Sequence, residues 1–160
     1  MSNFHKDGQI AREPENAVFT NMVMIEDSKG NVLVQRRTRG WNGLVFPGGH
    51  LKEKETATDS AIREILEETG LTISKLRLCG IKQWFHNIEG RNVCFLFKTK
   101  LFEGNLTSSS EGEVFWMPLT ELKKSGEMAV GFDEMLKVFT DDSINEMYYP
   151  DDGDSKALLL

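Results

Sequence analysis

The chain has 160 residues, of which 39% are hydrophobic and 28% are charged, and its formal net charge is −6 at pH 7. This length suits a single domain with a self-sufficient core, and the composition lies far from the disordered and fibrous classes. The negative charge argues against binding to long nucleic acid, whose phosphates it would repel, whereas a small phosphorylated ligand held through a metal stays compatible with it.

The cysteine and hydropathy patterns predict a cytoplasmic protein with no membrane partner. Its two cysteines, Cys79 and Cys94, lie in apolar, strand-like stretches, and a secreted disulfide scaffold would normally carry more of them. Residues 1–16 contain no apolar run of signal-peptide length, and no segment approaches the roughly 20 apolar residues of a membrane span. We therefore expect both cysteines to be buried thiols.

The first predicted elements are an arm and a β-hairpin. Residues 1–16 are polar and aperiodic, so they are interpreted as an N-terminal arm. Residues 17–26, AVFTNMVMIE, are rich in apolar and β-branched side chains and are predicted to form a strand. The turn sequence DSKGN follows, and residues 32–37, VLVQRR, are predicted to be the hairpin partner of that strand.

A third short strand, LVF at residues 44–46, is expected to end at the proline that follows it, because proline cannot donate to a β-ladder. The next two residues, Gly48 and Gly49, allow the backbone to approach a ligand closely. A helix is then predicted between Thr56, as its N-cap, and Gly70, as its C-cap.

The predicted helix has an apolar face and an acidic face. At about 100° per residue, its apolar side chains fall on one side: Ala57, Ala61, Ile62, Ile65 and Leu66. Glu64, Glu67 and Glu68 are placed on the side opposite. We therefore expect one face to pack against the sheet and the other to present three carboxylates within reach of a single point.

The second half of the chain predicts more strands and a closing helix. Strands are expected at residues 76–85, 92–101 and 113–117, a short helical turn at 119–122 and a second helix at 132–139. The acidic residues 141–160 are interpreted as a C-terminal tail, which leaves residues 17–140 as the domain. This order of elements predicts an α/β fold in which helices cover a mixed sheet.

The three helix carboxylates suggest a site for a divalent cation. Like charges one helical turn apart repel each other, and oxygen-rich clusters suit Mg²⁺ or Mn²⁺, which bind a few carboxylates together with the phosphates of a substrate. A bound cation would lower the pKa of a coordinated water, so that a further carboxylate can act as a base. The alternative is an ordinary acidic solvent face beside Arg63 and Lys54.

The spacing of residues around the helix favours the cation site. From Gly49 to Leu71 the sequence follows the pattern G-x5-E-x7-REI-x-EE-x-GL, which resembles the signature of the Nudix hydrolases at every specified position. A chance match would occur in about one window in 10⁹. GLVFPGGHL before the pattern, the strand pair after it and EGEVFWMPLTEL at residues 111–122 resemble the flanking elements of MutT-like members. The resemblance covers roughly residues 17–140.

The resemblance implies a Nudix-type α/β/α sandwich with a mixed β-sheet. It also implies hydrolysis of a nucleoside diphosphate linked to another moiety, with Mg²⁺ or Mn²⁺ as cofactor and water attacking phosphorus. By similarity, Glu64, Glu67 and Glu68 hold the metal, Glu68 most strongly, and Glu64 doubles as the base. The backbone carbonyl of Gly48 is the expected further ligand. The catalytic candidates are Glu64, Glu67 and Arg63.

Two further expectations concern charged residues around this helix. Arg63 is expected to orient Glu55, because a buried charge needs a partner. In members of the family a further metal ligand or base often comes from a later loop. Glu111 is the first candidate for that role in this chain, and Glu113 is the second.

Arginine and aromatic side chains are the candidates for substrate binding. Arg36 and Arg37 lie close to the Pro-Gly-Gly turn in the sequence, and a guanidinium suits bidentate contact with phosphate. Alternation along a strand points the two to opposite faces, so one of them is expected to contact the polyphosphate. The candidates for stacking on a base are Trp41, Trp84, Phe85 and Trp116.

The predicted activity is cleavage of a nucleoside triphosphate to the monophosphate and pyrophosphate, with oxidised nucleotides such as 8-oxo-dGTP as substrates. Rival substrates within the family are ADP-ribose, dinucleoside polyphosphates, RNA 5′ ends and isopentenyl diphosphate. A non-catalytic nucleotide sensor is the rival from another class, but such modules typically lose one or more signature carboxylates, and all are present here. The expected partner is a small nucleotide, and homodimerisation is left open.

Overall fold

The computed structural model describes residues 14–150 and 156–160. Most of the predicted N-terminal arm therefore lies outside the described residues. Its described end is tied to the sheet, because the carboxylate of Glu15 pairs with the Arg91 guanidinium at 2.9 Å and the Arg91 amide donates to the carbonyl of Asn16 at 3.0 Å. None of the described helices is long and apolar enough to cross a membrane.

The largest sheet has five strands in the order β1-β6-β5-β9-β10. Its members are β1 (Ala17–Ile25), β6 (Gly90–Thr99), β5 (Arg77–His86), β9 (Glu146–Tyr148) and β10 (Leu158–Leu159). β1 runs parallel to β6 and β9 runs parallel to β5, whereas the β5–β6 and β9–β10 pairs are antiparallel. The sheet is mixed, as the sequence predicts.

Two smaller sheets and three helices complete the described part of the chain. An antiparallel sheet has the order β3-β2-β8, with β3 at Gly43–Val45, β2 at Asn31–Arg37 and β8 at Gly112–Pro118. Two strands that the sequence does not predict, β4 (Leu71–Ser74) and β7 (Leu101–Gly104), pair with each other. The helices are α1 (Ala57–Thr69), α2 (Leu119–Leu122) and α3 (Phe132–Thr140).

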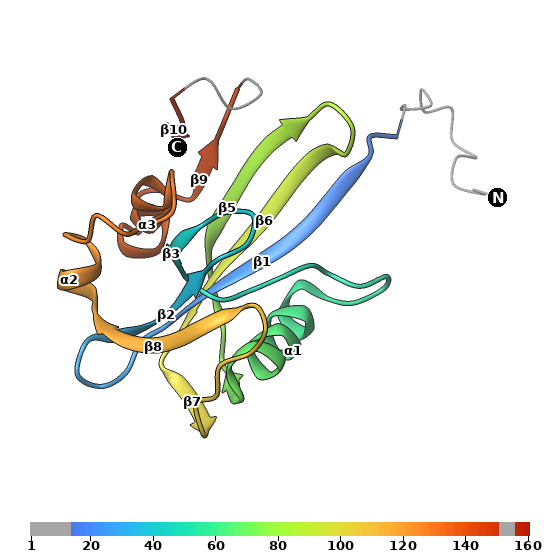
Figure 1. The fold of residues 1–160 in the computed structure, drawn as a ribbon. Helices are drawn as coiled ribbons and strands as arrows, with labels where there is room; N and C mark the ends of the chain where they lie inside the picture. Colours follow the sequence, from blue (N-terminus) through green and yellow to red (C-terminus); the bar gives the residue numbers. More distant parts are fainter. Residues whose placement is uncertain (1–13, 151–155) are drawn as a thin grey trace.

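The long helices cover opposite sides of the strands (Figure 1). α1 packs against β1 and β4, and α3 packs against β5, β6 and β9. On the α3 side the ring of Phe46 meets those of Phe132 and Phe139 edge-on, with centroid distances of 5.0 and 5.1 Å. On the α1 side Ile65 packs with Leu71 and other apolar side chains in a second cluster. The predicted α/β arrangement of helices over a mixed sheet is confirmed.

The predicted hairpin between the first two strands forms only beside its turn, where Glu26 and Val32 make one antiparallel bridge. The prediction is wrong for the rest of both strands. β1 pairs with β6, and β2 pairs with β3 and β8, so the two strands belong to different sheets. The turn between them does form, because the Asp27 carboxylate accepts hydrogen bonds from the amides of Lys29 and Asn31 at 2.8 and 2.9 Å. The end of β1 is buried on both faces, and such a strand can pair in parallel inside a fold.

The interpretation of residues 141–160 as a tail is also wrong for the residues described. β9 adds to the edge of β5, and β10 returns antiparallel to β9. The amide of Leu160 donates to the carbonyl of Glu146 at 2.9 Å, and Met147 and Ala157 are buried in the larger core. The acidic composition of this segment does not indicate strands in the sequence. The two short strands form because the sheet that they join stabilises them.

α1 has the predicted caps but a different buried face. The Thr56 hydroxyl accepts from the Asp59 amide at 3.0 Å, and Gly70 ends the helix with φ 73°. Leu66 is 50% exposed, whereas Ser60 and Glu68 are buried. The packed face is therefore turned towards the acidic side of the helix, and Glu68 belongs to the interior.

The two cysteines differ in burial. Cys94 is buried, as expected, but Cys79 is half-buried, and both are free thiols. Cys94 lies on β6 next to Lys82 of β5 in the strand register.

Candidate active site

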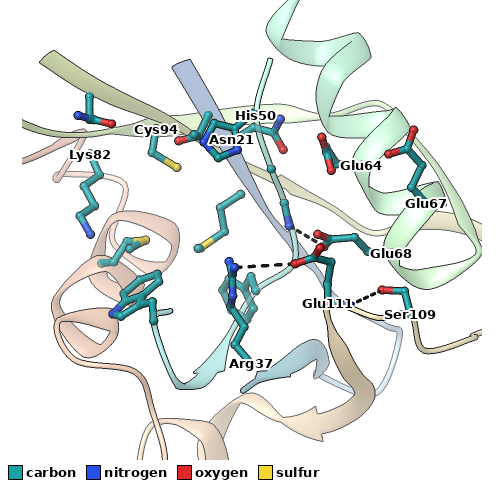
Figure 2. Close-up of a pocket in the computed structure, with 18 of the residues that line it drawn as sticks. Asn21, Arg37, His50, Glu64, Glu67, Glu68, Lys82, Cys94, Ser109 and Glu111 are labelled. Carbon is teal, nitrogen blue, oxygen red and sulfur yellow. Dashed lines mark hydrogen bonds and ion pairs between the residues drawn. The ribbon is translucent and has the colours of Figure 1, made fainter. Parts of the chain in front are cut away.

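A pocket of about 760 Å³ is bounded by α1, by β1, β5 and β6, by the Pro-Gly-Gly stretch and by the loop before β8 (Figure 2). It brings together residues that are far apart in the sequence. The predicted site residues in its wall are Arg37, Trp41, Gly48, Glu64, Glu67, Glu68, Trp84 and Glu111.

The stretch around Gly48 continues the sheet beside β1. The amides of Asn21 and Val23 donate to the carbonyls of Gly49 and Pro47, at 2.8 and 2.9 Å. The Gly48 amide points away from β1 and donates to Oε2 of Glu68 at 3.2 Å. In an extended segment the N–H and C=O of one residue point the same way, so the Gly48 carbonyl also faces the helix carboxylates.

Glycines are required at both positions because the backbones and side chains approach so closely. A Cβ at Gly48 would lie 2.1 Å from the carbonyl oxygen of Asn21, and a Cβ at Gly49 would lie 2.4 Å from the carboxylate of Glu64. Gly48 therefore lets the loop lie against β1, and Gly49 lets the Glu64 carboxylate lie against the loop.

Glu68 sits in the most enclosed part of the acidic cluster. It is 7% exposed, and its Oε2 also accepts from the Gln35 amide at 3.3 Å. The pKa of Glu68 is raised to about 7, mainly by burial and also by the charges of Glu64 and Glu111, while the hydrogen bond from the Gly48 amide opposes this shift. The negative charges at this position are thus only partly compensated by the groups of the protein itself.

Arg63 pairs with two carboxylates of the acidic cluster, Glu64 and Glu67, and with Glu55, which lies outside that cluster. Its guanidinium donates to Glu55 at 2.7 and 2.9 Å, to Glu64 at 2.8 Å and to Glu67 at 3.2 Å, and it also reaches the carbonyl of His50 at 3.0 Å. The hydrogen bond from Arg63 lowers the pKa of Glu55 to about 2. Neither Arg63 nor Glu55 lines the pocket, so the structure places the pair behind the site.

The loop before β8 brings Glu111 to the pocket. The Glu111 amide donates to the Ser109 hydroxyl at 3.2 Å, which orients the loop, and its carboxylate lies 3.9 Å from the Arg37 guanidinium (Figure 2). Nε of Arg37 is buried and has no hydrogen-bond partner among the described residues. Glu113 does not line the pocket. Of the two loop candidates, the structure therefore brings Glu111 to the site.

Arg36 and Arg37 point to opposite faces of β2. Arg36 pairs with Glu127 at 3.2 Å and lies over the ring of Phe115, outside the pocket. Of the aromatic candidates, Trp41 and Trp84 line the pocket. Trp116 packs on Phe102, with the ring centroids 5.0 Å apart, and Phe85 is 43% exposed and does not line the pocket.

The carboxylates do not yet converge on a single point. Within the described residues, no three acidic, histidine or cysteine side chains are gathered tightly enough to hold a metal ion. The reason is that Arg63 draws Glu64 and Glu67 towards itself, while the Gly48 amide draws Glu68.

Several residues of the pocket are not singled out by the sequence. Lys82 and Asn92 line it from β5 and β6, and Asn21 lines it from β1. The side-chain Nδ2 of Asn21 donates to the Ser60 hydroxyl at 2.9 Å, but Oδ1 of Asn21 is buried without a partner among the described residues. The one available signal is a lysine or asparagine in the middle of an otherwise apolar strand, and that pattern does not say which pocket the side chain enters.

Comparison with known proteins gives consistent results. Residues 18–139 match the family model of the NUDIX domain. The uncharacterized Nudix hydrolase YvcI of Bacillus subtilis is 33% identical over 109 residues, which cover 65% of this chain and 67% of that protein. The oxidized purine nucleoside triphosphate hydrolase of Mus musculus is 30% identical over 111 residues, covering 66% and 68%. The matches to other curated relatives cover about half of the length of those proteins or less.

Solved structures share the fold. The crystal structure of the mutator MutT protein from Bacillus halodurans superimposes with a TM-score of 0.73 at 27% sequence identity, and the match covers 89% of this chain and 97% of that one.

Proposed function

Because the chain belongs to the Nudix family, we propose that it is a Mg²⁺-dependent pyrophosphohydrolase that cleaves nucleoside triphosphates to the monophosphate and pyrophosphate. The observation that carries this proposal is the meeting of Glu64, Glu67, Glu68 and Glu111 in one pocket. That pocket also contains Arg37 and two tryptophans, so groups suited to a cation, a phosphate chain and a planar base line one cavity.

The donor set fits a hard divalent cation. Carboxylate and carbonyl oxygens are the ligands that Mg²⁺ and Mn²⁺ prefer, and the raised pKa of Glu68 indicates uncompensated negative charge where a cation would be stabilised. Glu64, Glu67, Glu68 and Glu111 and the carbonyl of Gly48 would hold it. A cation bound there supplies charge neutralisation for the polyphosphate and lowers the pKa of an attacking water.

The residues of the chain itself divide the remaining tasks. Glu64, whose carboxylate lies directly beside Gly49, is the proposed base that orients the attacking water. Arg63 positions Glu64 by its 2.8 Å hydrogen bond while Glu55 fixes the guanidinium from behind. Arg37 presents a guanidinium with an unpaired Nε to the pocket, as far as the described residues go, and this suits contact with the phosphate chain.

Oxidised purine nucleotides such as 8-oxo-dGTP are the proposed substrates. The support is the 30% identity to a relative whose name states hydrolysis of oxidized purine nucleoside triphosphates. Trp41 and Trp84 in the pocket wall offer flat faces to a purine ring. Conversion of such nucleotides to monophosphates would remove them from the nucleotide pool.

A nucleotide panel tests the proposal. The wild type is incubated with Mg²⁺ and GTP, dGTP, 8-oxo-dGTP, ATP, ADP-ribose or a dinucleoside polyphosphate, and monophosphate and pyrophosphate are quantified by chromatography. The proposal expects the highest kcat/KM for 8-oxo-dGTP and loss of activity with EDTA. A higher kcat/KM for ADP-ribose would overturn the substrate assignment, and absence of turnover of every compound with Mg²⁺ or Mn²⁺ would favour a sensor.

A further inference from the structure

The end of the pocket away from the acidic cluster contains one lysine among aromatic rings. Lys82 lies across the pocket from Glu64, Glu67 and Glu68 (Figure 2). Its ammonium nitrogen lies 4.8 Å from the ring centroid of Trp41, 4.9 Å from that of Trp84 and 5.6 Å from that of Tyr149. The two tryptophans line the pocket together with Lys82.

The sheet determines this placement. Side chains on β5 alternate between two faces, so Lys82 and Trp84 share the face that lines the pocket, while Gln83 points the other way and hydrogen-bonds with Glu146 of β9. In the register, Lys82 lies opposite Cys94 of β6. Trp41 is held by its own hydrogen bond to the carbonyl of Val130 at 3.0 Å. The lysine and the rings around it are therefore positioned by backbone structure.

Lys82 is not neutralised by an acidic residue. Among the described residues no carboxylate pairs with its ammonium, and no hydrogen bond from that group to a described residue is present. Burial lowers the pKa of Lys82. Contact with aromatic faces compensates part of the lost hydration of a cation, but ring faces leave N–H donors unsatisfied. An oxygen atom of a ligand would complete the environment.

A neutral carbonyl group fits this end of the pocket better than a second phosphate. Among the described residues lining the pocket, Arg37 is the only other lysine or arginine, and it lies beside Glu111. A phosphate dianion is normally bound by several donors or cations, whereas here the ammonium of Lys82 is surrounded by aromatic rings. Two of these rings, Trp41 and Trp84, pack against an apolar cluster that includes Met22 and Met135, and both methionines also line the pocket. These surroundings suit a planar, uncharged ring with a carbonyl oxygen on its edge.

We infer that Lys82 is a specificity-determining residue that donates a hydrogen bond to a carbonyl oxygen on the nucleobase, so that the pocket selects 6-oxopurines and 4-oxopyrimidines over the corresponding amino bases. An amino group at the same position would turn its own N–H donors towards the ammonium and lose the bond. The inference rests on the proposed function, because it assigns the base that the proposed nucleotide substrate carries.

Two pairs of nucleotides that differ at this edge test the inference. The ratio of kcat/KM for ITP over ATP, and for UTP over CTP, is measured for the wild type, for Lys82→Met, which keeps length but removes charge and donors, and for Lys82→Arg, which keeps both. A matched control, Lys100→Met, removes an exposed lysine that pairs with Glu26 far from the pocket. Circular dichroism and thermal unfolding verify that each variant is folded.

The wild type is expected to prefer the oxo nucleotide of each pair by about 10- to 100-fold, the range of a hydrogen bond to a charged group. Lys82→Met should reduce each ratio to about 3-fold or less by slowing the oxo substrate, whereas Lys82→Arg and Lys100→Met should keep the preference. Unchanged ratios in Lys82→Met, or a wild-type preference for ATP and CTP, would overturn the inference. The inference would also be overturned if Lys82→Met selectively lost turnover of ADP-ribose, because Lys82 would then bind an anion.

Binding of monophosphates separates this inference from the proposed function. IMP and AMP, or UMP and CMP, are titrated against the fluorescence of the pocket tryptophans without any turnover. If no triphosphate is hydrolysed, the proposed function fails, and tighter binding of IMP that is lost in Lys82→Met still supports the role of Lys82. Equal binding of IMP and AMP by the wild type refutes that role even in an active enzyme.

Discussion

Replacing Gly49 by alanine should disable the enzyme without unfolding it. The new Cβ would lie 2.4 Å from Cδ and Oε2 of Glu64, whereas ordinary contacts start at 3.4 Å. The Glu64 carboxylate must therefore retreat by about 1 Å, which a flexible side chain can do. Its hydrogen bond to Arg63, now 2.8 Å, has to stretch or reorient with it.

The size of the effect follows from that displacement. A catalytic group misplaced by about 1 Å can cost roughly 100-fold in rate, so kcat for the best nucleotide should fall by about that factor. The melting temperature should change little, because the backbone of Gly49 lies outside the positive-φ region and accepts alanine. Affinity for Mn²⁺, measured by calorimetry, should also fall if Glu64 is a metal ligand.

Two other glycines provide the comparison. In Gly48→Ala the Cβ would lie 2.1 Å from the carbonyl oxygen of Asn21 and 2.7 Å from Cα of Met22, and this strand backbone cannot retreat. That variant should lose about 1–3 kcal/mol of stability. A Cβ at Gly126 would meet no heavy atom of the described residues within 4 Å, so Gly126→Ala should keep both activity and stability. Near-wild-type kcat and Mn²⁺ affinity in Gly49→Ala would refute the assignment of Glu64.

Three further predictions concern charged residues. Glu68→Gln should lower Mg²⁺-dependent pyrophosphate release by at least about 100-fold, and near-normal release would exclude Glu68 as a metal ligand. Arg37→Ala should raise KM for triphosphates, whereas Arg36→Ala should leave KM unchanged and alter stability by at most about 1 kcal/mol, because its ion pair is exposed; equal effects on KM would contradict the placement of Arg37 in the pocket. In EDTA at pH 7, the wild type should have a higher melting temperature than Glu55→Gln. Since Arg63 lowers the pKa of Glu55 from 4.5 to about 2, this advantage should be complete above pH 4.5 and disappear as the pH falls towards 2; a gap that persists at pH 2 would refute the ion-pair explanation.

The sequence predicts the central helix and its carboxylates better than it predicts which strands pair with each other. The caps of α1 are local features, since Thr56 and Gly70 act on atoms within four residues, and they are predicted correctly. The spacing of Glu64, Glu67 and Glu68 is likewise a property of a single helix. The family signature lies within this continuous segment, so the family and its proposed metal chemistry can be predicted from one stretch of sequence.

Strand partners depend on contacts between distant segments, and there the sequence misleads. A turn that ends β1 looks the same whether the next strand returns beside it or crosses to another sheet, because the Asp27 turn satisfies its own hydrogen bonds in either case. The strands β9 and β10 are short and acidic at their flanks, and they become strands only because β5 offers a free edge.

The sequence by itself determined the helix, its three carboxylates and the family to which they belong, because these depend on spacing along one segment. Only the tertiary structure decided that Glu111 rather than Glu113, and Arg37 rather than Arg36, enters the pocket. The register of β2 and β8 pairs Arg36 with Glu113, away from the pocket, and the loop before β8 brings Glu111 beside Arg37. Only the tertiary structure placed Lys82 across from the carboxylates, since that position depends on three strands meeting at one pocket.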